Sequence, residues 1–466
     1  MPIRKKDIDK ILIIFLFSHL IIWTLVPSIT NNNLPLDTIE ALAWGSDMDW
    51  GFNKHPPTSA FFLNLFYQLF GNQDWVYYLL SQIFVVSSFF IIFKFSEDFL
   101  SNRFYSLISI LLLEGIYFYN FTTPEFNVNV SQLPFWALSV YYCWKGVKNN
   151  EIINWLLFGF FAAVGVLAKY LFVYLLFAVD VFFIYLIINK KFNFKCLISL
   201  ITFFAILFPH FIWLSNNDYS TITYALHRTG IENSNFVTSH LIYPFTFLAK
   251  QIGILVPFFI MISVILSKFK IKLNFKDKKF IFLFIINIVP IVLMFLTSLV
   301  IGAKIRTMWM TPYYMFMGVL IVYIFQKKIS VKKFKYFLLV FLALFIFSPV
   351  AYSYVSIINK DKRTDYPGKE ISQIVQKKWD NNFTNEIIVV GGDDWHSWNL
   401  SYHLKNRPKW DNIFENKKNP AIKNKDGGFV LIGDKEILQK ICNGIFFTVL
   451  DHNLKSLGVC MIGKKI

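Results

Sequence analysis

Apolar residues in this chain are grouped into blocks long enough to cross a membrane. An α-helix needs roughly 20 apolar residues to cross about 30 Å of hydrocarbon. The chain is 55% hydrophobic and only 16% charged, whereas soluble domains carry about 25% charged residues. We therefore predict an all-α polytopic membrane protein with about eleven transmembrane helices, at residues 11–28, 74–93, 104–119, 126–144, 152–168, 171–189, 196–213, 242–266, 280–301, 309–325 and 336–356.

The placement of Lys and Arg predicts which span ends face the cytoplasm. The formal net charge is +17, and most basic side chains lie in segments that are cytoplasmic if the N-terminus is inside. The positive net charge is thus explained by the membrane topology and by attraction to anionic lipid, and no nucleic-acid partner is expected. No small-residue cleavage site follows the first span, which predicts a retained helix in a multi-pass protein. Eleven spans with the N-terminus inside put the C-terminus outside. The external segments hold few cations, namely Lys54, Lys169, Arg228, Lys304 and Arg306.

The composition changes abruptly after Ile357. Short apolar runs then alternate with polar stretches, a pattern that indicates a small α/β domain outside the membrane. We predict a transmembrane domain at 1–357 and a soluble domain at 358–466, with a helix near 434–442 and strands at 386–390, 428–432, 446–450 and 458–462. Cys442 and Cys460 both fall in the soluble domain, where they form either a disulfide or two buried thiols. Cys143 and Cys196 are expected to be packing residues.

The external loops hold most of the candidate functional residues. Carboxylates beside a bilayer are costly if they lose water, so they are usually retained for chemistry or ion binding. The first loop, 29–73, carries an acidic cluster, and its residues 58–70 predict a helix lying on the membrane surface. Asp47 and Asp49 in this loop are expected to be solvated. The other candidate loops are 120–126, 214–236 and 302–308.

The residue types in these loops suit a lipid-phosphate substrate. Asp37 and Glu40 are three residues apart, so they share one face of a helical turn, and Glu125 supplies a third carboxylate. Cations hold a phosphate and stabilise it as it leaves, while a carboxylate acts as a base. The candidate catalytic residues are Asp37, Glu125 and Glu40, and the candidate binding residues are Lys54, His55, Lys169, Tyr170, His227, Arg228, Lys304 and Arg306.

These residues resemble motifs of the GT-C glycosyltransferases. The resemblance is to protein O-mannosyltransferases and to the bacterial transferases that add aminoarabinose or related sugars to lipid A. It rests on the first-loop acids, the Lys54–Pro57 element before the interfacial helix, the acid Glu125, the Lys169-Tyr170 pair, and Arg306 with Met308 and Trp309. Pro367-Gly368, Gly391-Gly392 and Arg407-Pro408 are similar to the external domain of bacterial members. Family members often have Asp where this chain has Glu125.

The resemblance implies an inverting transfer of a hexosyl or pentosyl group outside a bacterial inner membrane. The implied donor is a sugar linked to polyprenyl phosphate, and the implied acceptor is lipid A, lipopolysaccharide or another glycolipid. One alternative is a protein acceptor. The other is a lipid-linked sugar flippase, but transporters place ionisable residues near the midplane, often with internal symmetry. The acids here fall at span ends, which favours an enzyme.

Several of these residues also have purely structural interpretations. Asp37 suits a helix cap, His55 a fixed turn before Pro56-Pro57, and Lys169, Lys304 and Arg306 interfacial anchors. Asp393, Asp394 and His396 resemble a metal trio by residue type, but their position in a Gly-rich turn favours helix capping. No cofactor is indicated with certainty. A divalent cation near Asp37, Glu40 and His55 is left open.

Overall fold

The computed structural model describes residues 4–229, 235–269, 271, 273–411, 427–442, 446–452 and 455–466. These residues form two compact units. The first, here called the helical unit, contains residues 1–27, 50–58 and 78–355. The second, the sheet unit, contains residues 28–49, 59–77 and 356–466. The predicted boundary at 357 is close to the start of the last segment, but two segments of the first external loop also belong to the sheet unit.

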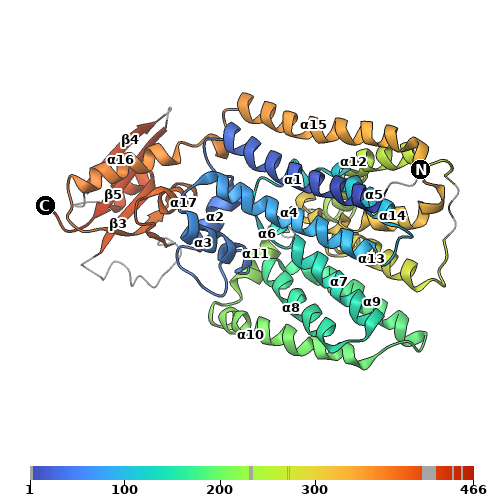
Figure 1. The fold of residues 1–466 in the computed structure, drawn as a ribbon. Helices are drawn as coiled ribbons and strands as arrows, with labels where there is room; N and C mark the ends of the chain where they lie inside the picture. The colour runs from blue at the N-terminus through green and yellow to red at the C-terminus, as the bar shows by residue number, and fades with distance from the viewer. Residues whose placement is uncertain are drawn as a thin grey trace. The chain divides into compact units, whose positions relative to one another are not determined.

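Helices cover all eleven predicted spans (Figure 1). Among the described residues, seven helices are long and apolar enough to cross a membrane, and a pair bent by 49° (Thr307–Tyr314 with Met317–Lys328) is an eighth candidate. The helices are α1 (Lys5–Thr30), α4 (Asp74–Ser96), α5 (Arg103–Leu111), α6 (Val128–Ser131), α7 (Leu133–Asn149), α8 (Ile152–Ala168), α9 (Val173–Ile188), α10 (Ser199–Asn216), α11 (Ser220–Arg228), α12 (Tyr243–Ile265), α13 (Lys278–Ile301), α14 (Met317–Phe325) and α15 (Phe334–Ile358).

The predicted span at 104–119 is not one continuous helix. After α5 the chain forms two 3₁₀ turns, η1 (Leu112–Gly115) and η2 (Tyr117–Tyr119), separated by the extended residue Ile116. The Asn120 side chain donates to the main-chain oxygen of Glu114, at 2.9 Å. This bond engages a carbonyl at the helix end that has lost its helical partner.

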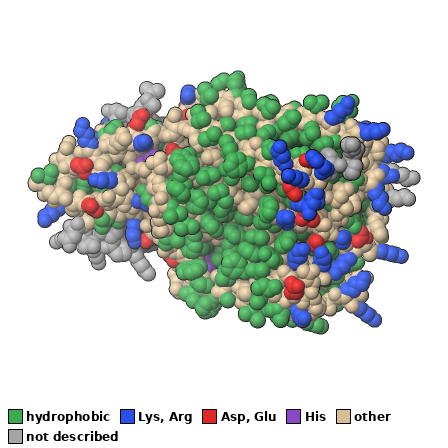
Figure 2. Space-filling model, in the orientation of Figure 1, with side chains coloured by type: hydrophobic (Ala, Val, Ile, Leu, Met, Phe, Trp, Pro, Cys, Tyr) green, Lys and Arg blue, Asp and Glu red, His purple; other side chains and the backbone are tan. Residues whose placement is uncertain are grey.

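On the surface of the helical unit, hydrophobic and basic side chains occupy different parts of the face that Figure 2 shows. In Figure 2, a continuous hydrophobic surface covers the middle of the visible face, and Lys and Arg gather at the end where α1 begins. At this basic end the Asp98 carboxylate forms ion pairs with Lys145 and Lys148, with nitrogen–oxygen distances of 2.9 and 2.8 Å. The apolar surface bounded by cations fits a span whose basic end faces the cytoplasm. That orientation remains a prediction.

The sheet unit is built on five strands in the order β2-β1-β3-β5-β4. β1 is parallel to β2 and β3, whereas β5 is antiparallel to β3 and β4. The four predicted strands are present, and the two-residue β2 was not predicted. Their bounds are β1 (Ile387–Gly392), β2 (Lys409–Trp410), β3 (Gly428–Asp434), β4 (Phe446–His452) and β5 (Lys455–Ile462), and the helices of the unit are α2 (Leu36–Trp44), α3 (Thr58–Phe70), α16 (Gly368–Asp380), α17 (Asp394–His403) and α18 (Lys435–Ile441).

Both faces of the sheet are covered. Successive strand residues point to opposite faces, so Val430 packs in the cluster with α16 and α17 while Leu431 packs with α18. A disulfide joins Cys442, after α18, to Cys460 in β5, which decides between the two states left open by the sequence. Cys143 and Cys196 are buried thiols in the helical unit, as predicted.

α3 begins and ends where the sequence predicted a helix, while its position on a membrane surface remains a prediction. The predicted turn at Gly391–Asp394 is instead the junction between β1 and α17. Gly392 has φ +114°, and a Cβ there would lie 2.1 Å from the oxygen of Ile432, so a glycine is required. Asp393 is the N-cap of α17, and its carboxylate accepts from the His396 main chain at 3.2 Å. The capping interpretation is therefore confirmed for Asp393.

Candidate active site

Lys169 is a buried cation at the end of α8. Its side chain is 6% exposed. The ammonium donates to Asn129 Oδ1 and lies 5.4 Å from the centre of the Trp309 ring. Lysine is almost never buried unless it is paired, and here a hydrogen bond and a cation–π contact replace part of its hydration. The side chain does not extend into solvent, as an interfacial anchor would.

The chain after Lys169 folds back onto α8. A Cβ on Gly165 would lie 2.2 Å from the Phe172 ring, so the glycine allows the turn η3 (Tyr170–Phe172) to pack there. The Tyr170 hydroxyl then lies 2.6 Å from His210 Nε2 and 2.8 Å from Thr221 Oγ1. His210 Nδ1 lies 2.6 Å from the main-chain oxygen of Trp50, an acceptor, so Nδ1 carries the proton and Nε2 accepts from Tyr170.

Three positively charged side chains act on His55. Reduced hydration, followed by the charges of Lys169, Lys54 and Arg228, lowers the pKa of His55 to about 3. The imidazole is therefore neutral at physiological pH and offers hydrogen bonds rather than a charge. Its ring packs edge-on against Tyr224 of α11, with centroids 6.1 Å apart. The structure thus brings His55 together with three predicted cations.

The remaining predicted cations lie on neighbouring segments of the helical unit. His227 and Arg228 are exposed in the last turn of α11, whose Thr221 contacts Tyr170. Lys304 donates its main-chain N–H to the oxygen of Thr229, directly after α11, at 2.9 Å. Arg306 is the N-cap of η7 (Thr307–Tyr314) and is half-buried. Residues 230–234, which include Glu232 of the predicted loop 214–236, lie outside the described residues.

Glu125 precedes the short helix α6. Asn127 is the N-cap of α6, and its amide donates to Glu125 Oε2 at 3.4 Å. Asn129, in the first turn of α6, receives the hydrogen bond from Lys169. The Glu125 carboxylate and the Lys169 ammonium are thus both hydrogen-bonded to residues 127–129 of the helical unit.

Asp37 and Glu40 lie on α2 of the sheet unit. Asp37 is the second residue of the helix and half-buried, and the N-cap is Pro35. The carboxylate is therefore not the helix cap, and its position in the first turn suits the positive end of the helix dipole. Glu40 lies one turn later and is 7% exposed, so it is not a solvated loop acid. Asp47 and Asp49 are exposed, as expected.

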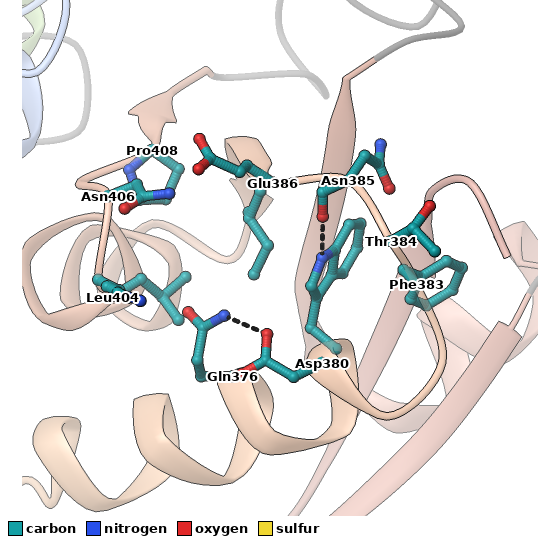
Figure 3. A pocket seen from close by; sticks show the side chains of 12 residues that line it. Gln376, Asp380, Phe383, Thr384, Asn385, Glu386, Leu404, Asn406 and Pro408 are labelled. Carbon is teal, nitrogen blue, oxygen red and sulfur yellow. Dashed lines mark hydrogen bonds between the residues drawn. The ribbon is translucent and has the colours of Figure 1, made fainter. Parts of the chain in front are cut away.

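A separate pocket in the sheet unit contains none of the predicted site residues (Figure 3). It has a volume of about 230 Å³ and lies between α16, the start of β1 and the segment after α17. Gln376 donates to Asp380 at 2.9 Å, and the Trp379 indole donates to the oxygen of Asn385 at 2.6 Å. The first bond joins two lining side chains, and the second joins the Trp379 side chain to the main chain of Asn385.

No three His, Cys, Asp or Glu side chains within the described ranges are arranged to hold a metal ion. We therefore assign no metal ligands.

The sequence did not identify several polar residues around Lys169 and Tyr170. Asn129, His210 and Thr221 all hydrogen bond to these two side chains. A polar residue inside an apolar segment is a detectable signal, and both Asn129 and His210 follow that pattern. Their partners lie 40 residues away in the chain, which periodicity cannot reveal.

Residues 54–213 match the family model of dolichyl-phosphate-mannose-protein mannosyltransferases. This range holds Lys54, His55, Glu125, Lys169 and Tyr170. No curated protein sequence matches the chain significantly.

Two solved structures are similar over nearly the whole chain. ArnT from Cupriavidus metallidurans bound to undecaprenyl phosphate matches with a TM-score of 0.67 at 12% identity, covering 96% of this chain and 97% of that chain. The apo state of ArnT matches with a TM-score of 0.64 at 11% identity, covering 97% and 98%. The chain therefore has the fold of ArnT, a helical part with a small sheet domain, and the predicted resemblance is confirmed.

Proposed function

We propose that this protein transfers a sugar from a polyprenyl-phosphate donor to an acceptor outside the cytoplasm. The observation that carries the proposal is the buried Lys169, held by Asn129 and Trp309, whose positive charge acts on His55 together with those of Lys54 and Arg228. Positive charge in a site of low hydration attracts a phosphate strongly. The family model that matches residues 54–213 describes enzymes of dolichyl-phosphate mannose, and ArnT has been crystallised with undecaprenyl phosphate. Both ligands are polyprenyl phosphates.

The cations serve the leaving group. As the glycosidic bond breaks, the lipid phosphate gains negative charge, so a cation that contacts it stabilises the transition state more than the ground state. We assign this role to Lys169 and Arg306, with Lys54, His227, Arg228 and Lys304 as further binding residues. Neutral His55 and the Tyr170 hydroxyl supply hydrogen bonds without adding charge.

The carboxylates serve the acceptor. A hydroxyl is a weak nucleophile at neutral pH and needs a general base, which we assign to Asp37, with Glu125 and Glu40 as secondary carboxylates. Attack on the anomeric carbon from the face opposite the phosphate would invert its configuration. An acceptor phosphate, as on lipid A, is already ionised and requires orientation more than deprotonation. We propose lipid A or another glycolipid as the acceptor.

Transfer by the purified protein tests the proposal. The protein in detergent is given a radiolabelled sugar on undecaprenyl phosphate and either lipid A or a peptide, and products are identified by mass spectrometry. We expect a sugar-modified lipid A. Modified peptide would instead identify a protein acceptor, and no product from any polyprenyl-phosphate sugar would contradict the proposal.

The principal carboxylate is tested with a matched pair. Asp37→Asn should lower turnover about 10²- to 10⁴-fold, the usual cost of losing a base or an electrostatic contact. Asp47→Asn changes an acid of the same loop that is 63% exposed and pairs with Lys409, so its turnover should stay near wild type. Equal turnover of the two variants would remove Asp37 from the mechanism.

Membrane orientation is tested separately. The proposed site requires residues 358–466 in the periplasm of an inner-membrane protein. A C-terminal alkaline phosphatase fusion should be active, and a fluorescent fusion that matures only in the cytoplasm should be dark. The opposite result would place the candidate loops on the wrong side.

A further inference from the structure

Two ionisable side chains are buried next to each other inside the helical unit. His19 of α1 and Glu114 of η1 are both fully shielded, with His19 Nδ1 3.4 Å from Glu114 Oε2. Aromatic rings surround the imidazole, with Phe89 and Phe15 at centroid distances of 5.5 and 5.9 Å. Buried polar pairs add little to stability compared with apolar packing, so this pair needs another explanation.

Glu114 is the first link of a buried hydrogen-bond chain. The Asn120 amide donates to Glu114 Oε1 at 3.1 Å and to the Glu114 main-chain oxygen at 2.9 Å. The Asn120 side-chain oxygen accepts from the main chain of Phe121 at 2.6 Å. The Asn120 side chain therefore fixes the backbone directly after η2.

The series of hydrogen bonds continues from Asn120 through Thr123 to α4. The Thr123 hydroxyl donates to the oxygen of Asn120 at 2.7 Å and accepts from the Gln82 amide at 3.0 Å. Ser81, one residue earlier on α4, donates to the oxygen of Thr123. Ser81, Gln82, Asn120 and Thr123 are each at most 1% exposed.

These bonds hold the loop that carries Glu125 from two sides. We propose that Glu114, Asn120, Thr123, Gln82 and Ser81 form a positioning network, with His19 in contact beside Glu114, that fixes the Glu125 carboxylate for transfer. Glu125 follows Thr123 by two residues, separated by Pro124, whose ring restricts the backbone further. The Tyr119 hydroxyl also donates to the oxygen of Thr311 in η7, at 2.8 Å, so the same loop is joined to the helix that begins after Arg306. The inference rests on the proposed function for its catalytic consequence.

Ser81 and Ser88 offer a matched test on one helix. Both are buried in α4, but Ser88 donates to Phe84 within its own helix, at 2.6 Å, and not to the loop. Ser81→Ala should lower kcat about 10-fold with little change in donor KM, because small misplacements of catalytic groups are costly. Ser88→Ala should leave kcat within about 2-fold of wild type. Equal effects of the two substitutions would overturn the proposal.

Glu114 distinguishes hydrogen bonding from charge. Glu114→Gln keeps an oxygen that accepts from Asn120, so kcat should stay within about 3-fold of wild type. Glu114→Leu removes the side-chain acceptor and leaves the Asn120 amide only its bond to the main-chain oxygen of residue 114, so kcat should fall about 10- to 100-fold. Turnover by Glu114→Leu equal to that of Glu114→Gln would contradict the network.

Hydrogen exchange measures the positioning without any catalytic assay. Amides of residues 116–126 should exchange faster in Ser81→Ala and Glu114→Leu than in wild type, and unchanged in Ser88→Ala. Unchanged exchange in all variants would refute the network even if transfer is observed. If Ser81→Ala and Glu114→Leu exchange faster than wild type but the wild-type protein shows no transfer, the network is retained and only the proposed function is rejected.

Discussion

The Lys169 ammonium donates a hydrogen bond to the side-chain oxygen of Asn129, a residue 40 positions earlier in the chain. This bond joins the end of α8 to the first turn of α6, two residues after the N-cap Asn127 that contacts Glu125. Because the ammonium also lies over the Trp309 ring, its charge is held at one place. A cation placed before the substrate arrives needs little reorganisation when phosphate charge develops.

Lys169 is predicted to act on the donor phosphate. Lys169→Gln removes the charge, so donor KM should rise and kcat should fall, with kcat/KM lower by about 10²-fold or more. Lys169→Arg keeps the charge but brings a planar guanidinium into space shaped for an ammonium, so it should recover only part of the loss. Steady-state kinetics with a varied polyprenyl-phosphate sugar measures both. Unchanged donor kinetics in Lys169→Gln would show that the phosphate binds elsewhere.

His55 is predicted not to titrate in the physiological range. Its pKa of about 3 keeps the imidazole neutral from pH 5 to pH 8. The pH profile of kcat/KM should therefore be the same for wild type and His55→Gln in that range, although the absolute rates differ. An inflection near pH 6 that disappears in His55→Gln would contradict the environment described here.

The same depressed pKa makes a prediction for stability. The unfolded chain binds a proton at His55 below its ordinary pKa of about 6.5, whereas the folded chain does so only near pH 3. The unfolded state therefore binds more protons between these values, and stability falls as the pH decreases from about 6.5 toward 3. Thermal unfolding in detergent should show a shallower acid dependence for His55→Gln than for wild type. An identical dependence would argue against a neutral imidazole at this half-buried position.

The main elements could be predicted because their signals are local. Span lengths and strand alternation are read within a few residues of sequence, which explains why the helix at Thr58–Phe70 and the strands near Gly428 and Phe446 were placed correctly. The break after Leu111 was missed because apolar composition continues through it. The Asn120 amide bonds the Glu114 main-chain oxygen at this break, a contact that apolar composition does not reveal.

Which segments of the chain form the sheet unit could not be predicted from the sequence. Arg407 donates to Asn64 at 2.6 Å and to the oxygen of Leu42 at 3.0 Å, across more than 340 residues of chain. Periodicity carries no information about such pairs, so the first-loop segments were assigned to the transmembrane domain. The site was similarly limited: residue types indicated Lys169 and His55, but their partners and the lowered pKa required the fold.

Arg407 is predicted to hold the sheet unit together. Its guanidinium lies 3.9 Å from the Tyr67 ring centre in addition to its two hydrogen bonds. The residue has φ +44°, a conformation that is costly for a non-glycine residue, so the side-chain contacts must outweigh this cost. Arg407→Lys loses the bidentate fork and should destabilise the unit by about 1–3 kcal/mol.

Arg407→Gly provides the matched comparison, because glycine adopts this backbone conformation without strain. If the side-chain contacts matter, Arg407→Gly should also unfold at a lower temperature than wild type. Differential scanning fluorimetry and limited proteolysis of the full chain in detergent measure both. A glycine variant more stable than wild type would show that backbone strain outweighs the contacts.

The disulfide between Cys442 and Cys460 is predicted to stabilise the sheet unit and to report its compartment. The cysteines are 18 residues apart, and closing a loop of that length in the unfolded chain corresponds to about 3 kcal/mol in the chain-entropy model. The double variant Cys442→Ala with Cys460→Ala should therefore unfold at a lower temperature, whereas Cys143→Ala, at a buried free thiol of the helical unit, should leave the proteolytic stability of the sheet unit unchanged.

The same disulfide can be tested by labelling of the cysteines. Protein from membranes, unfolded with alkylating agent and no reductant, should be labelled only at Cys143 and Cys196, and at all four cysteines after reduction. Labelling of all four without reductant would show that the bond does not form in the cell, as expected if residues 358–466 faced the reducing cytoplasm.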